Sequence, residues 1–146
     1  MKIKHKSSLV VTLILMSIPL LLVAINVVHI QARLYSLRHK NHESILAACR
    51  EAIANRGSYR NDRVQWSSLN KDQIVLLPPL PSNLPLPIRD LNPKNVLIDK
   101  EWVQINLSLP FYRISIIGYN SGARQAGTTK YIDGLWLLTG AGSTNM

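Results

Sequence analysis

The sequence predicts an α+β protein: an amino-terminal transmembrane helix continues into a juxtamembrane helix, which packs on a four-stranded antiparallel β-meander. Three patterns lead to this class. Residues 9–28 carry no charge, residues 31–57 place apolar side chains at helical spacing, and residues 94–139 alternate as strands do. Short turns between the strands favour antiparallel pairing, because parallel strands need a long crossover connection.

The same changes of pattern divide the chain into six segments. They are a basic tail (1–8), an anchor helix (9–30), a juxtamembrane helix (31–57), an irregular, proline-rich connector (58–93), the sheet (94–139) and a disordered tail (140–146). With the anchor set aside, about 115 residues remain, which is enough for one small domain with one core.

The charge-free run predicts a membrane anchor. Twenty helical residues are about 30 Å long, which matches the hydrocarbon core of a bilayer. A cleavable signal peptide is the alternative, and the basic start of the chain (Lys2, Lys4, Lys6) suits one. Signal peptides, however, have only about 7–15 apolar residues before a site with small side chains. Cleavage after Ala32 would put the bulky Ile30 in that site, so an uncleaved, single-pass anchor is favoured.

Basic residues flank the anchor on both sides in nearly equal numbers: Lys2, Lys4 and Lys6 before it, and Arg33, Arg38 and Lys40 after it. A short basic tail before the first apolar segment is the usual form of a signal anchor, and basic flanks favour the cytoplasmic side. We therefore expect the amino terminus in the cytoplasm of a bacterial cell and the carboxyl-terminal domain outside the inner membrane.

The net charge of +9 is concentrated beside the anchor. Residues 31–71 hold eight basic and three acidic side chains, whereas residues 72–146 hold six and five. Basic residues next to a bilayer are attracted to anionic lipid head groups, so the bilayer and these lipids are expected partners. Residues 59–66 combine arginines with Tyr59 and Trp66, as a nucleic-acid-binding stripe would, but their position beside the anchor favours a membrane-proximal segment.

A helix is expected to follow the anchor as far as Gly57, since no proline or glycine interrupts residues 30–56. Four apolar side chains share one of its faces: Ile45, Cys49, Ala52 and Ile53. Gly57 suits the position just past a helix end. Lys40 and Asn41 mark the place where this long helix could break.

The connector contains six prolines between residues 78 and 93. They exclude a helix interior and a central strand, because proline lacks an amide donor and has a fixed φ. We expect extended chain here, with one helical turn upstream at residues 68–73. Such a segment could be a peptide ligand for an aromatic groove. The leucines between the prolines favour packing on the domain instead.

Four strands are expected from Asn95 onward: one around Val96 and Ile98, then 102–109, 112–119 and 134–139. Residues 99–101 form the first turn, and residues 120–133, rich in Gly, Ser and Thr, form a mobile hairpin loop. Helix and sheet together predict a core of Ile45, Cys49, Ile53, Val103, Ile105, Leu107, Ile114, Ile116 and Leu137.

The sequence predicts no catalytic, cofactor or metal site. All four histidines lie at or before residue 42, and the carboxylates of the sheet segment lie at its turns. His39, His42 and Cys49 could share a helical face as metal ligands, but no further ligand cluster follows them. The glycines of residues 121–127 lack the spacing of a phosphate-binding loop.

One face of the expected sheet carries more apolar area than a solvated face normally shows. If alternation sends the core residues inward, four large side chains fall together on the other face: Trp102, Ile117, Tyr119 and Trp136. Two explanations stay open. The proline-rich connector covers this face, or a partner binds there.

An apolar amino-terminal helix before an antiparallel sheet resembles the layout of type IV pilins and pseudopilins. Their processing site, a small residue followed by Phe and then a Glu five positions into the mature chain, has no counterpart here, so no family is assigned. The features favour a non-enzymatic, membrane-anchored interaction or assembly module that binds a protein or its own copies. The alternative is a small tethered ligand-binding or hydrolytic domain that uses residues 120–133 and Arg124.

Overall fold

The computed structural model describes residues 4–59, 73–109, 112–121 and 129–141. The chain divides into two compact units, residues 1–39 and 40–146. The predicted helical turn at 68–73, the centre of the predicted loop at 122–128, and residues 142–146 of the predicted tail fall outside the described residues, apart from residue 73.

The first unit contains helix α1, Lys4–Arg38, with Pro19 inside it. Its part from Ile14 to Arg38 has 25 residues and contains an 18-residue stretch with a mean hydropathy of 2.0. Among the described residues, this is the one helix that is long enough and apolar enough to cross a membrane. Large apolar side chains between residues 14 and 28 are exposed all around the helix. A helix that is apolar on every side is suited to lipid rather than to a half-buried place on a domain.

The expected helix over residues 31–57 is not continuous. Helix α1 ends at Arg38, and helix α2 covers His42–Ala54. Between them Asn41 takes an extended conformation, and its side-chain oxygen accepts a hydrogen bond from the Ser44 amide at 3.1 Å. Asparagine is a favoured N-cap because it satisfies an amide that the helix leaves without a partner. The chain thus breaks at Lys40 and Asn41, where a new helix begins. Helix α2 ends before Gly57 and is followed by the 3₁₀ turn η1, Arg56–Tyr59.

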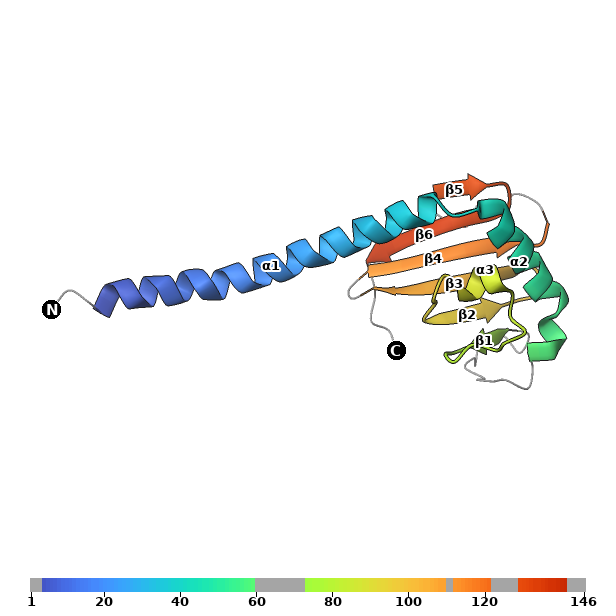
Figure 1. Ribbon diagram of the computed structural model, residues 1–146, viewed down its shortest axis with the longest axis horizontal. Helices are drawn as coiled ribbons and strands as arrows, with labels where there is room; N and C mark the ends of the chain where they lie inside the picture. Colours follow the sequence, from blue (N-terminus) through green and yellow to red (C-terminus); the bar gives the residue numbers. More distant parts are fainter. Residues whose placement is uncertain (1–3, 60–72, 110–111, 122–128, 142–146) are drawn as a thin grey trace. The chain divides into compact units, whose positions relative to one another are not determined.

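The second unit is built on an antiparallel sheet of six strands in the order β1-β2-β3-β4-β6-β5 (Figure 1). The strands are β1 Ile74–Leu76, β2 Asn95–Ile98, β3 Trp102–Leu109, β4 Tyr112–Tyr119, β5 Thr129–Ile132 and β6 Leu135–Ala141. The α+β class is confirmed and all four expected strands are present, but the count of four is wrong. The two additional strands, β1 and β5, are short edge strands in segments that we expected to be irregular.

Helix α2 packs on β3 and β4 and covers one face of the sheet (Figure 1). Eight of the nine expected core residues are buried, and Ile53 alone is half-buried. Cys49 of α2 and Gly118 of β4 approach each other closely. A Cβ atom at Gly118 would lie 2.7 Å from both Cβ and Sγ of Cys49. Only glycine therefore lets the helix come this close to the sheet.

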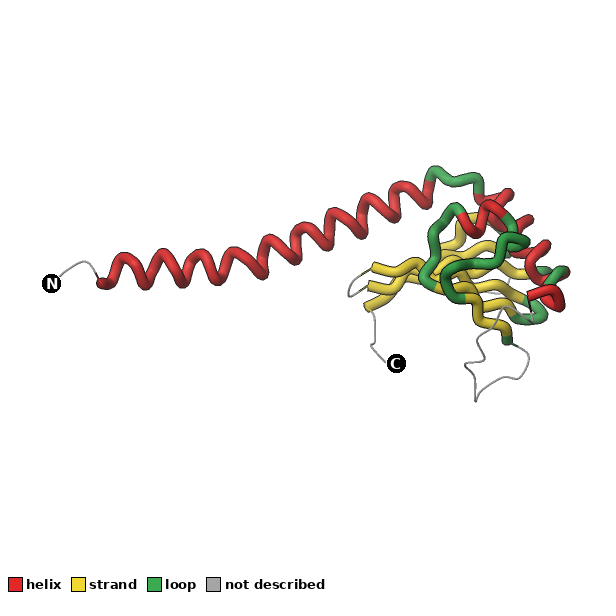
Figure 2. The backbone as a smooth tube through the Cα atoms, turned by 60° about the horizontal axis from the view of Figure 1, so that its bottom comes forward, coloured by secondary structure: helices red, strands yellow, loops and turns green. Residues whose placement is uncertain are grey.

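The connector packs on the same side of the sheet as α2. It contains one helical turn, α3 (Leu86–Arg89), where extended chain was expected. Pro87 is tolerated because the first turn of a helix has no internal partner for its amides. Leu84 and Ile88 are buried, Leu86 is exposed, and α3 contacts α2. Figures 1 and 2 show both helices on one side of the strands, so the proline-rich part of the connector, residues 78–93, does not cover the second face. Residues 60–72 of the connector lie outside the described residues.

A candidate interaction surface on the open face of the sheet

The register brings the four predicted surface residues together. Trp102 of β3 lies opposite Tyr119 of β4, and Ile117 of β4 lies opposite Trp136 of β6. Directly opposed residues in an antiparallel pair have their Cβ atoms about 5 Å apart. Since Gly118 faces Cys49, its neighbours Ile117 and Tyr119 face away from α2. We call this side of the sheet, turned away from α2 and α3, the open face.

These four side chains are less exposed than expected of a face bathed in water. Ile117 and Tyr119, on the central strand, retain 7% and 9% of their accessible surface, and the two tryptophans are half-buried. Three further half-buried apolar residues occupy the open face by register: Val75 of β1, Leu97 of β2 and Leu138 of β6. The sequence showed part of the alternation in these strands. It could not show that strand pairing places these three residues beside the aromatic cluster.

A row of polar side chains crosses the open face next to this cluster. The Asn106 side-chain oxygen accepts hydrogen bonds from Ser115 Oγ at 2.6 Å and from Gln104 Nε2 at 2.7 Å. The Asn106 amide nitrogen donates to Asn95 Oδ1 at 2.6 Å. Ser115 is fully buried, so its hydroxyl is satisfied by this network rather than by water. Sequence reasoning missed the network, because its members meet only through the register of β2, β3 and β4.

Trp136 adds an unusual feature to the surface. Its indole Nε1 is buried and has no hydrogen-bond partner among the described residues. A buried donor without a partner costs free energy, about 1–3 kcal/mol, and most buried donors are satisfied.

The open face is poor in charge. Its charged side chains at described register positions are Arg113 and Lys130, both basic and both exposed, and Lys130 pairs with Asp133. The centre, formed by the aromatic cluster and the amides, is neutral. This contrasts with the basic character of the whole chain, whose net charge is +9.

The three residues weighed as metal ligands have other surroundings. The His42 ring stacks on Tyr131 of β5, with centroids 4.1 Å apart and planes 7° apart. His39 Nδ1 lies 2.8 Å from the Tyr35 carbonyl oxygen in its own helix. Cys49 is fully buried, and burial raises the pKa of its thiol to about 12. A thiol in this state supplies almost no thiolate near neutral pH and is a poor nucleophile or ligand. The described residues contain no cluster of three or more metal-binding side chains.

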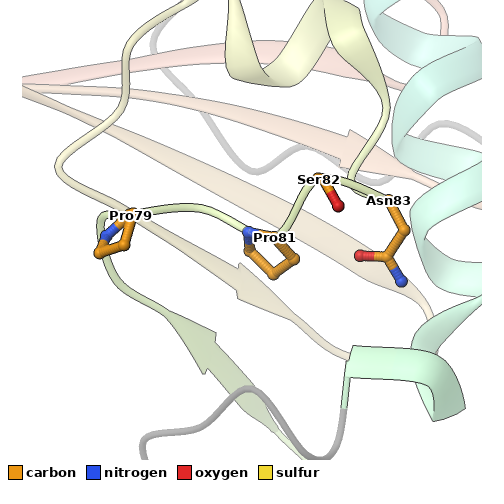
Figure 3. A pocket seen from close by; sticks show the side chains of 4 residues that line it. All are labelled: Pro79, Pro81, Ser82 and Asn83. Carbon is orange, nitrogen blue, oxygen red and sulfur yellow. The ribbon is translucent and has the colours of Figure 1, made fainter.

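A hollow of about 510 Å³ lies in the connector and is lined by Pro79, Pro81, Ser82 and Asn83 (Figure 3). The Asn83 side-chain amide nitrogen donates to Ser58 Oγ at 3.4 Å, and the Asn83 backbone carbonyl oxygen accepts from the Tyr59 hydroxyl at 3.5 Å. None of the four lining side chains is titratable, so they offer no acid or base to a reaction. The hollow is a consequence of how the connector folds rather than a candidate active site.

The sheet carboxylates also have structural roles or lie at the surface. Asp99 Oδ1 accepts a hydrogen bond from the Lys100 amide at 2.6 Å, which stabilises the turn between β2 and β3. Glu101 is exposed in the same turn. Arg124, central to the alternative ligand-binding function, lies outside the described residues.

Comparison with protein-family models, curated proteins and solved structures finds no match for this chain. A role for the open face must therefore come from its own chemistry: apolar and aromatic side chains, a satisfied amide network, one indole donor without a partner, and little charge.

Proposed function

We propose that this chain is a single-pass protein of the bacterial inner membrane whose extracytoplasmic domain is a non-enzymatic docking module for a protein. One observation carries the proposal: the register gathers Trp102, Ile117, Tyr119 and Trp136 on the sheet face that α2 and α3 leave uncovered. Aromatic side chains dominate binding energy at protein interfaces because they bury much area at low entropic cost.

The anchor part of the proposal rests on α1. Its length and its exposed apolar surface suit a bilayer, and the basic residues that follow the charge-free run suit anionic lipid head groups. We expect the full chain to stay in the membrane fraction after carbonate washing, because a spanning helix is not released by high pH. Recovery in the soluble fraction, or a mature amino terminus at Arg33, would contradict the anchor. A reporter enzyme fused after Met146 that is active only in the cytoplasm would contradict the orientation.

The docking part makes a separate prediction. Replacing both tryptophans, Trp102→Ala with Trp136→Ala, should weaken complexes that the full chain forms in its membrane by roughly 30-fold or more, the loss expected for a 2 kcal/mol anchor. The measurement is the yield of complexes captured by a photoreactive residue placed at Gln104 on the open face. Thermal unfolding of the double variant, followed by circular dichroism, shows that the sheet is intact.

Two matched variants complete this test. Leu86→Ala removes an exposed apolar side chain from the connector side and should leave the complexes unchanged. Arg124→Ala addresses the alternative function and should also have no effect on them. The docking proposal fails if the two tryptophan changes leave the complexes intact, or if a photoreactive residue at Arg50, on the exposed side of α2, captures them equally well.

A further inference from the structure

We infer that helix α1 pairs with the α1 of a second copy of this chain inside the bilayer, along a stripe that contains Asn26. This inference rests on the anchor part of the proposed function and is independent of the open face. We call the stripe the seam and define it as Leu15, Pro19, Leu22, Asn26 and His29. These residues recur alternately four and three positions apart, the spacing that lets two parallel helices pack along a common line.

Asn26 is a polar side chain of this helix whose hydrogen-bonding capacity is only partly used. Its Nδ2 donates to the Leu22 carbonyl oxygen at 2.8 Å. A side-chain amide has two N–H groups and an acceptor oxygen, so one N–H and Oδ1 remain without a partner among the described residues. This Oδ1 is not one of the buried unpaired polar atoms, so it is open to a partner at the helix surface. Ser17 differs, because its hydroxyl donates its single hydrogen to the Ile14 carbonyl oxygen at 2.8 Å.

The depth of Asn26 makes these unused groups costly. Asn26 lies 20 residues after Lys6 and seven before Arg33, the charges that flank the apolar stretch. A hydrocarbon core of about 30 Å centred between these charges ends near His29, which leaves Asn26 about 5 Å inside it. There is no water at this depth to pair with an amide. A polar group on a neighbouring helix can do so, and such groups hold membrane helices together.

A second copy of the chain fits this requirement by construction. Two amides complement each other, since each can donate and accept. Two copies inserted in the same direction hold Asn26 at the same depth, and a two-fold axis along the bilayer normal brings both side chains to the seam. The helix of another protein would need a polar group at this depth and on the packing face. The rest of the seam also suits pairing, because Leu15 and Leu22 are exposed.

The seam ends at His29 for a physical reason. Arg33 continues the same stripe, seven residues after Asn26, and two copies of this arginine repel each other. At the level of the head groups their long side chains can turn apart into water. The contact is therefore short, and one interhelical hydrogen bond strengthens association only about 5- to 30-fold. Pairing should be reversible and should rise with the protein-to-lipid ratio.

The first test identifies the face of α1 that forms the contact. The full chain, in phosphatidylcholine vesicles, carries Leu22→Cys in the seam and is oxidised briefly to form disulfides. Leu20→Cys is the matched control, because Leu20 is the same residue type, lies two positions away on the opposite side of the helix and is more exposed. Native Cys49 is fully buried, so the parent protein serves as a blank. We expect roughly tenfold more dimer from Leu22→Cys, because a disulfide requires closely spaced Cα atoms.

The second test asks whether the amide causes the pairing. Energy transfer between fluorescent proteins fused after Met146, measured over a series of protein-to-lipid ratios, gives the dissociation constant of the dimer. Asn26→Leu makes the helix more apolar but should weaken the dimer about 5- to 30-fold. Asn26→Gln keeps an amide and should stay closer to the parent. Equal losses in both variants, an unchanged constant in Asn26→Leu, or equal disulfide yields from Leu20→Cys and Leu22→Cys overturn the inference.

Carbonate washing of the same vesicles separates this inference from the anchor on which it rests. Release of the parent chain into the soluble fraction contradicts both. A chain that resists washing but stays monomeric at every protein-to-lipid ratio overturns the pairing of α1 and leaves the anchor standing. In native membranes, a photoreactive residue at Leu22 should capture a product of twice the mass of the chain. Capture of a different protein alone also overturns the second copy as the occupant of the seam.

Discussion

Replacing Ile105 by Asp should abolish cooperative unfolding of the sheet domain. Ile105 is fully buried at the centre of β3, between Val96 of β2 and Ile116 of β4. The change removes apolar contacts and places a carboxylate where the residues directly opposite on both sides are apolar. Each effect costs several kcal/mol, and their sum is comparable to the whole stability of a small domain. Circular dichroism of the detergent-solubilised chain should show loss of the sheet signal and of its thermal transition.

Leu86→Asp is the matched control for this result. Leu86 is apolar too, but its side chain is 58% exposed at the start of α3, where a carboxylate meets water and the positive end of a helical turn. The free energy of unfolding of this variant should lie within about 0.5 kcal/mol of that of the parent. If Ile105→Asp melted like Leu86→Asp, the register of β3 would be shifted by one residue and the two sheet faces would exchange roles.

Periodicity predicted the core because it reports burial directly. The apolar stripe of α2 and the alternation along β3 and β4 each place the apolar side chains on one side of the element. This holds whichever element packs against that side. Ile45, Cys49 and Ile116 could therefore be assigned without knowing the topology, and all are buried. Ile53 differs: it lies in the last turn of α2, and its side chain is half-buried.

The edges of the sheet could not be predicted in this way. Strand β1 has three residues and β5 has four, too few for a period to show. They form because β2 and β6 offer free backbone groups, which is a property of the folded sheet rather than of the short segments. In β5 the pairing also contains an irregularity between Lys130 and Ile132, which disturbs the alternation further.

The open face was predictable only in part, less than the core and more than the edge strands. Alternation placed Trp102 and Trp136 opposite the core, but it could not show that pairing brings them together beside Ile117 and Tyr119. The amide network around Asn106 was beyond reach for the same reason, since each hydrogen bond but one joins two strands. The side of the sheet taken by the connector depended on tertiary packing, and proline content alone gave no information about it.

Replacing Gly118 by Ala should destabilise the domain by about 1–3 kcal/mol, the usual cost of forcing an extra methyl group into a packed core. The new Cβ would lie 2.7 Å from two atoms of Cys49, so α2 would have to move away from β4. Gly140→Ala is the control, because nothing lies within 4 Å of a Cβ there. Urea denaturation of each variant gives the free energy of unfolding, and the control should stay within about 0.5 kcal/mol of the parent.

A double-mutant cycle can test whether the clash with Cys49 causes the loss of stability in Gly118→Ala. Cys49→Gly removes both atoms that a methyl group at Gly118 would meet. This change itself destabilises the domain, by about 1 kcal/mol for glycine inside a helix and further through the loss of a fully buried side chain. If the clash causes the loss, Gly118→Ala should cost far less in the Cys49→Gly background than in the parent, with a coupling energy of about 0.5–3 kcal/mol. Additive losses would mean that Gly118 is needed for the backbone of β4 rather than for the close approach of α2.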